Sequence, residues 1–184
     1  GWLGNKTKQG FYKEVRQPDG SKEFHALNLD TLEYAAPVKA RFDSVKKTKD
    51  AEDPAERVKI LLAADDRAGQ LVRALTYQGL AYAASLIPEI ADTPQPMDDA
   101  MRWGFGHDLG PFETWDKLGV AATAENMQKE GFPAASWVNE MLEKGCVTFY
   151  EYEGDKKVGV YNPGLGKYEP IPSSPNLLIL KDLK

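Results

Sequence analysis

Apolar residues recur at helical spacing through the middle of the chain, and the clearest run lies between Asp66 and Ile87. The apolar positions of this run are three or four residues apart, as on one face of an α-helix, and comprise Ala68, Leu71, Val72, Leu75, Gly79, Tyr82, Ala83 and Leu86. Further apolar residues surround the C-terminal half, so we expect that half to be buried on most sides. Pro88 and the segment DTPQP end the predicted helix.

Shorter helices are predicted on both sides of this long one. Asp53-Pro54 combines an N-cap residue with a proline at the first helical position, which predicts a helix through Ala63. Downstream we expect four more helices, over 97–103, 111–118, 121–129 and 134–144. A glycine lies shortly after each of the last three. The segment PVKARFDSVKKTKDAEDPAE, residues 37–56, is polar and charged, which indicates a linker or surface segment.

Two other segments have the pattern of β-hairpins. Runs with strand character flank the turn sequence QPDGS near the N-terminus and the sequence EGDK near the C-terminus, and they cover residues 11–16, 23–29, 147–152 and 157–161. Together with the helices, these hairpins predict a mainly α fold, a helical bundle with flanking β-hairpins.

The two hairpin segments also resemble each other. Phe11-Tyr12 enters the first hairpin, and Tyr34, followed by a proline, leaves it. Phe149-Tyr150 and Tyr168 have the same places in the second, at offsets of 138 and 134 residues. The match predicts an internal repeat, with the end of one copy followed by a whole second copy.

Composition narrows the classes of function. The 184 residues are 42% hydrophobic and 28% charged, which is typical of a folded domain without a membrane span. The net charge of −5 comes from interspersed acids and bases, which argues against a nucleic-acid partner. The lone Cys146 excludes an internal disulfide and favours a reducing, cytoplasmic setting. The chain begins without Met, and we expect it to be a piece of a longer protein.

The segment RWGFGHDLGPFETWD, residues 102–116, is the strongest candidate for chemistry because it combines glycines, titratable groups and aromatic side chains. Its glycines do not make a dinucleotide fingerprint, because they follow a predicted helix instead of a strand and the third comes one position late. We therefore interpret the segment as a corner. Gly104 ends one helix in a left-handed conformation, Gly106 relieves the turn, Pro111 begins the next helix and Glu113 favours its dipole.

The other candidates in this corner have structural interpretations too. We expect Phe105, Phe112 and Trp115 to be core residues. His107-Asp108 is interpreted as a surface loop, because adjacent residues rarely orient each other for proton transfer without a third partner. Two histidines and one cysteine, widely separated, make no zinc pattern. No catalytic, cofactor-binding or metal-binding residue is predicted, and the substrate-binding residues are unknown.

Two motifs carry a resemblance to a known family. GWLGNKTKQGFYK closely resembles the segment that ends the C-terminal helical domain of 3-hydroxyacyl-CoA dehydrogenases, with Lys8 at a position where glycine is usual. DDAMRWGFGHDLGPFETWDKLGV resembles an earlier part of that same domain. The reversed order is that of the multifunctional β-oxidation proteins, which carry two such helical domains. The resemblance implies that residues 1–44 are the tail of a first helical repeat with its hairpin, 45–146 a second helical repeat and 147–184 a hairpin and extended linker.

The resemblance also implies where the chemistry lies. In this family the NAD-binding loop and the catalytic His with its Glu partner belong to an N-terminal domain that has no counterpart here. The substrate-contacting Gly-Phe-x-x-Asn-Arg motif falls on GQLVRA, where Gly69 matches but Arg73 and Ala74 replace Asn and Arg. This departure implies that the second repeat serves packing.

The implied parent oxidises (3S)-3-hydroxyacyl-CoA to 3-ketoacyl-CoA with NAD in fatty-acid β-oxidation. The implied partners are the missing NAD-binding domain, the first helical repeat, a crotonase-type hydratase domain and the acyl-CoA substrate. The fragment itself binds no cofactor and is expected to be inactive. The alternative is a stand-alone module that binds acyl-CoA or another protein.

Overall fold

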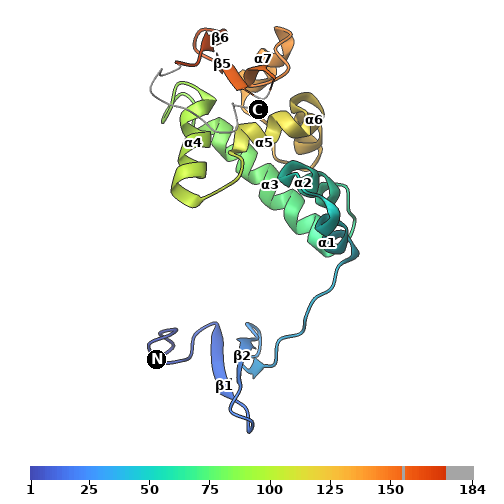
Figure 1. The fold of residues 1–184 in the computed structure, drawn as a ribbon, viewed down its shortest axis with the longest axis vertical. Helices are drawn as coiled ribbons and strands as arrows, with labels where there is room; N and C mark the ends of the chain where they lie inside the picture. Colours follow the sequence, from blue (N-terminus) through green and yellow to red (C-terminus); the bar gives the residue numbers. More distant parts are fainter. Residues whose placement is uncertain (155, 173–184) are drawn as a thin grey trace. The chain divides into compact units, whose positions relative to one another are not determined.

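The computed structural model describes residues 1–154 and 156–172 and divides the chain into two compact units (Figure 1). The first unit is Gly1–Arg41, and the second begins at Phe42. The extended linker expected at the C-terminal end, from residue 173 onward, lies outside the described residues.

The first unit contains a three-stranded antiparallel sheet with the strand order β1-β2-β3. Its strands are β1 (Tyr12–Arg16), β2 (Lys22–Leu27) and β3 (Tyr34–Ala35). The predicted hairpin is confirmed as β1 and β2. Gly20, at φ 84°, lies in its turn, and the Gln17 amide donates to the Ser21 carbonyl across the turn. The third strand was not predicted, because two paired residues are too few to leave a periodic pattern.

The second unit begins with helices. These are α1 (Asp43–Lys47), the 3-10 helix η1 (Thr48–Asp50), α2 (Pro54–Leu62), α3 (Arg67–Ser85), α4 (Pro94–Phe105), α5 (Pro111–Leu118), α6 (Val120–Lys129) and α7 (Ser136–Glu143). The predicted N-cap at Asp53 is confirmed, since its carboxylate accepts the Ala55 amide. Asp66 caps α3 in the same way through the Gly69 amide.

Residues 37–56, interpreted as a linker or surface segment, are not all linker, because α1 and η1 form within them. A tertiary contact accounts for the first of these helices. Ser44 on α1 is buried, and its hydroxyl donates to the Asp66 carboxylate at 2.9 Å, so α1 is anchored at the N-terminus of α3. The charged sequence by itself carries no sign of a partner 22 residues away.

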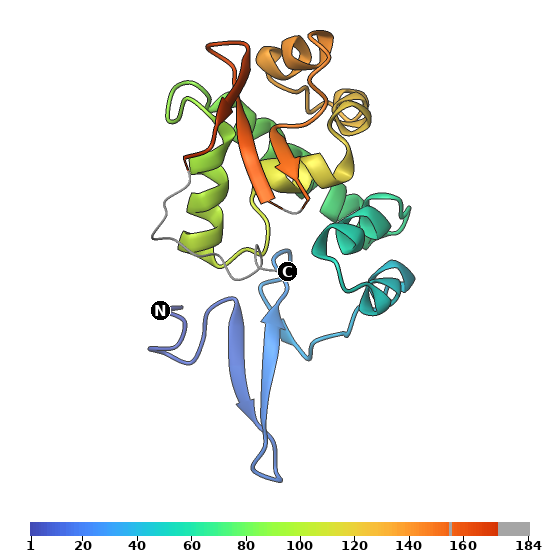
Figure 2. The same ribbon diagram turned by 45° about the horizontal axis from the view of Figure 1, so that its top comes forward.

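The predicted fold class, a mainly α bundle with flanking hairpins, is also wrong. The chain is 43% helical and 18% strand, with two three-stranded sheets. The second sheet consists of β4 (Tyr150–Glu153), β5 (Lys156–Asn162) and β6 (Lys167–Pro170). Its strands cross over α5 (Figure 2). The sheet segment contributes Phe149, Tyr150, Val160 and Tyr161 to the hydrophobic core, so the sheet is part of the domain and not an appendage.

The long helix α3 packs against α2 and α5, and its burial matches the prediction only in part. Its C-terminal half is largely buried, as expected. Tyr77, Leu80, Ala83 and Ala84 are buried on it. In contrast, Leu71, Leu75 and Tyr82, expected to face the core, are between 59% and 65% exposed. The apolar residues surround the helix broadly, and packing on only one side of it decided which of them are covered.

Candidate functional site

The corner between α4 and α5 is built around Asp98, a fully buried carboxylate on α4. Asp98 accepts the amides of Phe112 at 2.8 Å and Glu113 at 3.0 Å, so it caps the N-terminus of α5 from a neighbouring helix. The Glu113 carboxylate in turn accepts the Gly110 amide at 2.7 Å. Gly110 is required here because a Cβ atom at this position would collide with Asp98.

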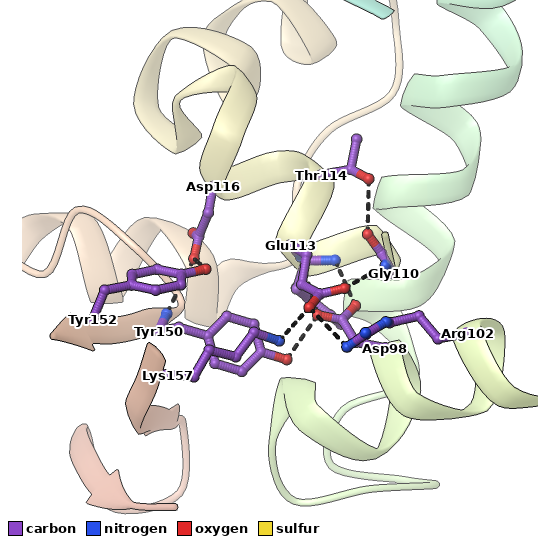
Figure 3. A network of polar contacts seen from close by, with 10 residues as sticks. Asp98, Arg102, Gly110, Glu113, Thr114, Asp116, Tyr150, Tyr152 and Lys157 are labelled. Carbon is purple, nitrogen blue, oxygen red and sulfur yellow. Dashed lines mark hydrogen bonds and ion pairs between the residues drawn. The ribbon is translucent and has the colours of Figure 1, made fainter. Parts of the chain in front are cut away.

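Side chains from the second sheet complete this cluster (Figure 3). The Tyr150 hydroxyl donates to Asp98 at 2.7 Å. The Lys157 ammonium lies 2.6 Å from the Glu113 carboxylate and 3.7 Å from the centre of the Tyr150 ring. Arg102 approaches the same Glu113 carboxylate at 3.3 Å. Charge pairing and hydrogen bonding therefore join two helices and one strand pair at a single point.

Asp116, one turn further along α5, binds the backbone that leads into the second sheet. Its two carboxylate oxygens accept the amide of Phe149 at 2.7 Å and that of Tyr150 at 3.1 Å. The Tyr152 hydroxyl lies 3.4 Å from the same carboxylate. Asp116 thus accepts two backbone amides at the beginning of the sheet, as an N-cap carboxylate accepts amides at the beginning of a helix, and so attaches the sheet to α5.

Burial dominates the electrostatics of the cluster. Desolvation raises the pKa of Asp98 to about 6 and that of Asp116 to about 7, against the opposing effect of the hydrogen bonds that they accept. Desolvation acts on Glu113 in the same direction, but the Gly110 amide and Lys157 outweigh it, and the pKa of Glu113 is lowered. Burial and the neighbouring Asp98 raise the pKa of the Tyr150 hydroxyl.

The polar groups of this cluster form hydrogen bonds and ion pairs with one another. Within the described residues, no buried side-chain nitrogen or oxygen lacks a hydrogen-bond partner. A nucleotide phosphate at a helix N-terminus needs free amides. The amides of Gly110, Phe112 and Glu113 already donate to carboxylates, and those carboxylates would repel a phosphate. This corner therefore does not fit NAD, and its polar groups serve to hold α4, α5 and the second sheet together.

The residues predicted in the corner have mixed outcomes. Pro111 begins α5, and Phe112 and Trp115 are fully buried, as expected. Phe105, expected in the core, is the last residue of α4 and is 76% exposed. Gly104 does not end the helix: Gly106 is the left-handed residue, with φ 70°, and its amide donates to Arg102.

The histidines take no part in the buried cluster. His107 and Asp108 are exposed, and the ring of Phe105 lies 6.4 Å from that of His107. His25, on β2, pairs with Glu23 at 3.0 Å. In the part of the chain that the structure describes, no group of three or more His, Cys, Asp or Glu side chains could hold a metal ion.

Arg73, at the position where the resemblance implies a substrate-contacting Asn, has structural partners. Its guanidinium donates to the carbonyls of Leu62 at 2.8 Å and Ala64 at 2.9 Å. Gly69 lies so close to the Ala64 carbonyl that a Cβ atom there would collide with it. Both motif positions therefore hold the C-terminal end of α2 against α3.

Sequence reasoning missed Asp98 and Asp116, the two carboxylates that organise the corner. A weak signal for Asp98 was available in the sequence, because helical spacing puts it on the same face as Pro94 and Met101. A polar residue within an apolar stripe indicates a buried partner. The partners themselves, 14 to 52 residues away, could not be named from spacing.

The comparisons with known proteins define the class first. No family model matches the chain. Among curated proteins, however, the chain is similar over its whole length to a probable 3-hydroxyacyl-CoA dehydrogenase, which confirms the resemblance that its motifs indicated.

The particular relative is a probable 3-hydroxyacyl-CoA dehydrogenase of Bacillus subtilis (strain 168). It is 38% identical over 184 residues, which are all of this chain and 22% of that protein. A putative fatty acid oxidation complex trifunctional enzyme of Rickettsia felis is 28% identical over 111 residues, 60% of this chain and 14% of that protein. The chain thus spans less than a quarter of the length of these relatives.

Proposed function

We propose that this chain is part of an NAD-dependent dehydrogenase that oxidises (3S)-3-hydroxyacyl-CoA to 3-ketoacyl-CoA in fatty-acid oxidation. The observation that carries the proposal is the 38% identity to a probable 3-hydroxyacyl-CoA dehydrogenase across all 184 residues. In this reaction the substrate gives a hydride from C3 to NAD⁺ and a proton from its hydroxyl group to a base. The proposal assigns both acceptors to parts of the enzyme outside these residues.

Within that enzyme, the chain has a domain-packing role and is inactive alone. The fully paired carboxylates of the corner and the structural use of Arg73 support this role. The proposed organisation has residues 1–44 as the tail of a first helical repeat, 45–146 as the helical part of a second and 147–184 as its sheet and linker. The division between Arg41 and Phe42 supports the first of these boundaries.

The proposed setting of the parent enzyme is the cytoplasm, with other activities in the same polypeptide. The name of the Rickettsia felis relative, a putative fatty acid oxidation complex trifunctional enzyme, supports a multi-activity arrangement. The hydratase domain is proposed as a partner from the motif resemblance. No helix in the described residues is long and apolar enough to cross a membrane.

A segment exchange tests the proposal. The matched segment of the Bacillus subtilis relative is replaced by this chain, and NAD reduction is measured with 3-hydroxyacyl-CoA. We expect activity in the chimera, loss of activity when the segment is deleted, and loss when the exchanged segment carries Gly110→Val. An active deletion variant would contradict the packing role.

The isolated chain gives the complementary test. We expect no NAD reduction from it and no heat of binding when acyl-CoA is titrated into it. Turnover abolished by His107→Ala would contradict the proposal. Saturable acyl-CoA binding by the isolated chain would favour the alternative, a stand-alone binding module.

A further inference from the structure

We propose that the exposed aromatic surface of the first sheet, made by Phe11 and Tyr12 at the beginning of β1 and Phe24 on β2, is a docking surface for a helical unit of the α4–α5 type, contributed by residues outside these 184. This inference rests on the likeness of the two sheets and goes beyond the proposed enzymatic function. The expected partner is a helical unit that presents a carboxylate next to aromatic side chains.

The two sheets have the same register around the Phe-Tyr pair and the third strand, although a β-bulge after Glu151 shifts the rest of the second hairpin. Tyr12 pairs with Ala26 in the first sheet, as Tyr150 pairs with Val160 in the second. On the other side of the middle strand, Leu27 pairs with Tyr34, as Tyr161 pairs with Tyr168. The offsets are 138 residues for the first strand and 134 for the other two, the values that the sequence match predicted.

Hydrogen bonds outside the strand ladders match as well. The Tyr34 hydroxyl donates to the Gly10 carbonyl at 2.5 Å, and the Tyr168 hydroxyl donates to the Thr148 carbonyl at 2.6 Å. Each accepting carbonyl belongs to the residue before the Phe-Tyr pair. A contact between residues 24 and 20 positions apart is not a general property of hairpins, so its occurrence in both sheets indicates a common design.

The turns between the second and third strands also agree. The Asn28 side-chain oxygen accepts the Thr31 amide at 3.1 Å, and that of Asn162 accepts the Leu165 amide at 3.2 Å. Leu32 has φ 59°, a conformation unusual for a leucine, at the position where the second sheet has Gly166 with φ 65°. The two copies keep the same turn although only one has glycine there.

The two sheets differ in what covers their first strand. Phe149 and Tyr150 are fully buried, whereas Phe11 is 74% exposed and Tyr12 is 66% exposed. Phe24, on the same face as Tyr12, is 56% exposed. Three exposed large aromatic side chains on one small sheet are the kind of apolar surface that marks an interaction site.

The second sheet shows what such a face fits. Asp116 on α5 accepts the amides of Phe149 and Tyr150, and Asp98 on α4 accepts the Tyr150 hydroxyl. The ring centroid of Phe149 lies 4.9 Å from that of Phe112 and 5.3 Å from that of Trp115. Among the described residues, the corresponding amide of Phe11 has no hydrogen-bond acceptor. The matching partner therefore presents a carboxylate to this amide and an aromatic pocket to the ring.

A second copy of this chain is not that partner. The α4–α5 unit of every copy is already filled by its own Phe149, Tyr150 and Lys157. The same occupation excludes the α4–α5 unit of the same chain. The helical unit therefore comes from outside the 184 residues, consistent with relatives of which the chain covers 22% and 14%.

Thiol labelling tests the proposal in the Bacillus subtilis chimera described above and in the isolated chain. Both carry Cys146→Ser and Phe24→Cys, and the rate of alkylation is measured. We expect the thiol at position 24 to react at least about tenfold more slowly in the chimera, because the docked helical unit covers it. Lys13→Cys is the matched control, since position 13 is exposed on the opposite face, and its rate should be the same in both proteins.

The outcomes separate the occupants. Equal rates at position 24 in both proteins, or equal protection at positions 13 and 24, would overturn the proposal. Protection that grows with the concentration of the isolated chain would identify a second copy as occupant and would also overturn it. Protection in a chimera without dehydrogenase activity would support the docking surface while the proposed function failed.

A measurement in trans covers the case in which the chimera does not fold. Hydrogen exchange of the wild-type 184-residue chain is followed with and without the Bacillus subtilis relative from which the matched segment has been deleted. We expect the amides of residues 11 and 12 to exchange about tenfold more slowly in the mixture, and a Tyr12→Ser variant to lose this effect. Unchanged exchange in the wild type would overturn the proposal.

Discussion

The sheets β1–β3 and β4–β6 have one backbone design and two different surroundings. In the second, the Phe-Tyr pair that opens the sheet is buried against α4 and α5, and Asp98 and Asp116 accept its hydrogen bonds. In the first, the equivalent pair is exposed. Pairing between neighbouring strands is therefore enough to form this sheet, whereas the burial of its aromatic residues requires a helical unit from another part of the protein.

The largest expected effect comes from removing the same ring in each sheet. Phe149→Ala should lower the free energy of unfolding of the second unit by about 3–5 kcal/mol, because a buried ring in contact with Phe112, Trp115 and Trp137 leaves a cavity. Phe11→Ala, at an exposed position, should change the free energy of unfolding of the first unit by less than about 0.5 kcal/mol. Denaturant unfolding followed by Trp fluorescence measures both. Equal costs would refute the difference in surroundings.

The second test concerns the corner that receives the sheet. Gly110→Ala should destabilise the second unit by about 1–3 kcal/mol, because the new methyl group collides with Asp98 and separates α4 from α5. Gly104→Ala is the control: it lies inside α4 with open space around its Cα, and alanine there should stabilise by about 0.5–1 kcal/mol. Melting temperatures of the two variants should therefore move in opposite directions.

The third test uses pH, because the carboxylates with strongly raised pKa values lie beneath the second sheet. Asp98 and Asp116 have folded-state pKa values of about 6 and about 7, above their unfolded values. Between pH 4 and pH 7 the folded state therefore binds more protons, and the free energy of unfolding should fall by at least about 1 kcal/mol as the pH rises through this window.

Asp116→Asn is the matched variant for the pH test. It removes one of the two titrating groups, so its stability should decline less steeply between pH 4 and pH 7 than that of the wild type. Local probes in the first sheet should show no such dependence. A wild-type stability that rises with pH over this window would contradict the raised pKa values.

The smallest effect is expected at His107. Its side chain is exposed on the loop between α4 and α5 and takes no part in the buried cluster. His107→Ala should change the free energy of unfolding by less than about 0.5 kcal/mol. A loss comparable to that of Gly110→Ala would mean that the loop supports the corner between α4 and α5, which the contacts do not indicate.

Most local signals along the chain predicted the structure correctly, although Gly106 ends α4 where Gly104 was expected to. Asp53 and Asp66 cap α2 and α3 as an N-cap residue does wherever it precedes a helix. Pro111 begins α5, and the turn residues between β1 and β2 close the predicted hairpin. The relation between the two Phe-Tyr pairs was also visible, because a repeat is a property of the sequence itself.

Errors arose where a residue acts on distant parts of the chain. The helix α1 depends on a contact with Asp66, and the buried face of α3 depends on where α2 and α5 lie. Phe105 and Phe112 have similar sequence surroundings, but one is exposed and the other fully buried. Apolar character alone cannot distinguish them, because burial requires a partner surface.

Residues close together in the chain, or direct comparison, were enough to predict the starts of α2 and α5, the turn of the first hairpin, the internal repeat and the relationship to 3-hydroxyacyl-CoA dehydrogenases. Only the tertiary structure decided that the second sheet belongs to the core and that Asp98 and Asp116 join it to the helices. The physical reason is that a buried carboxylate is stable only where several donors from separate elements meet it, and that meeting exists only in the folded chain.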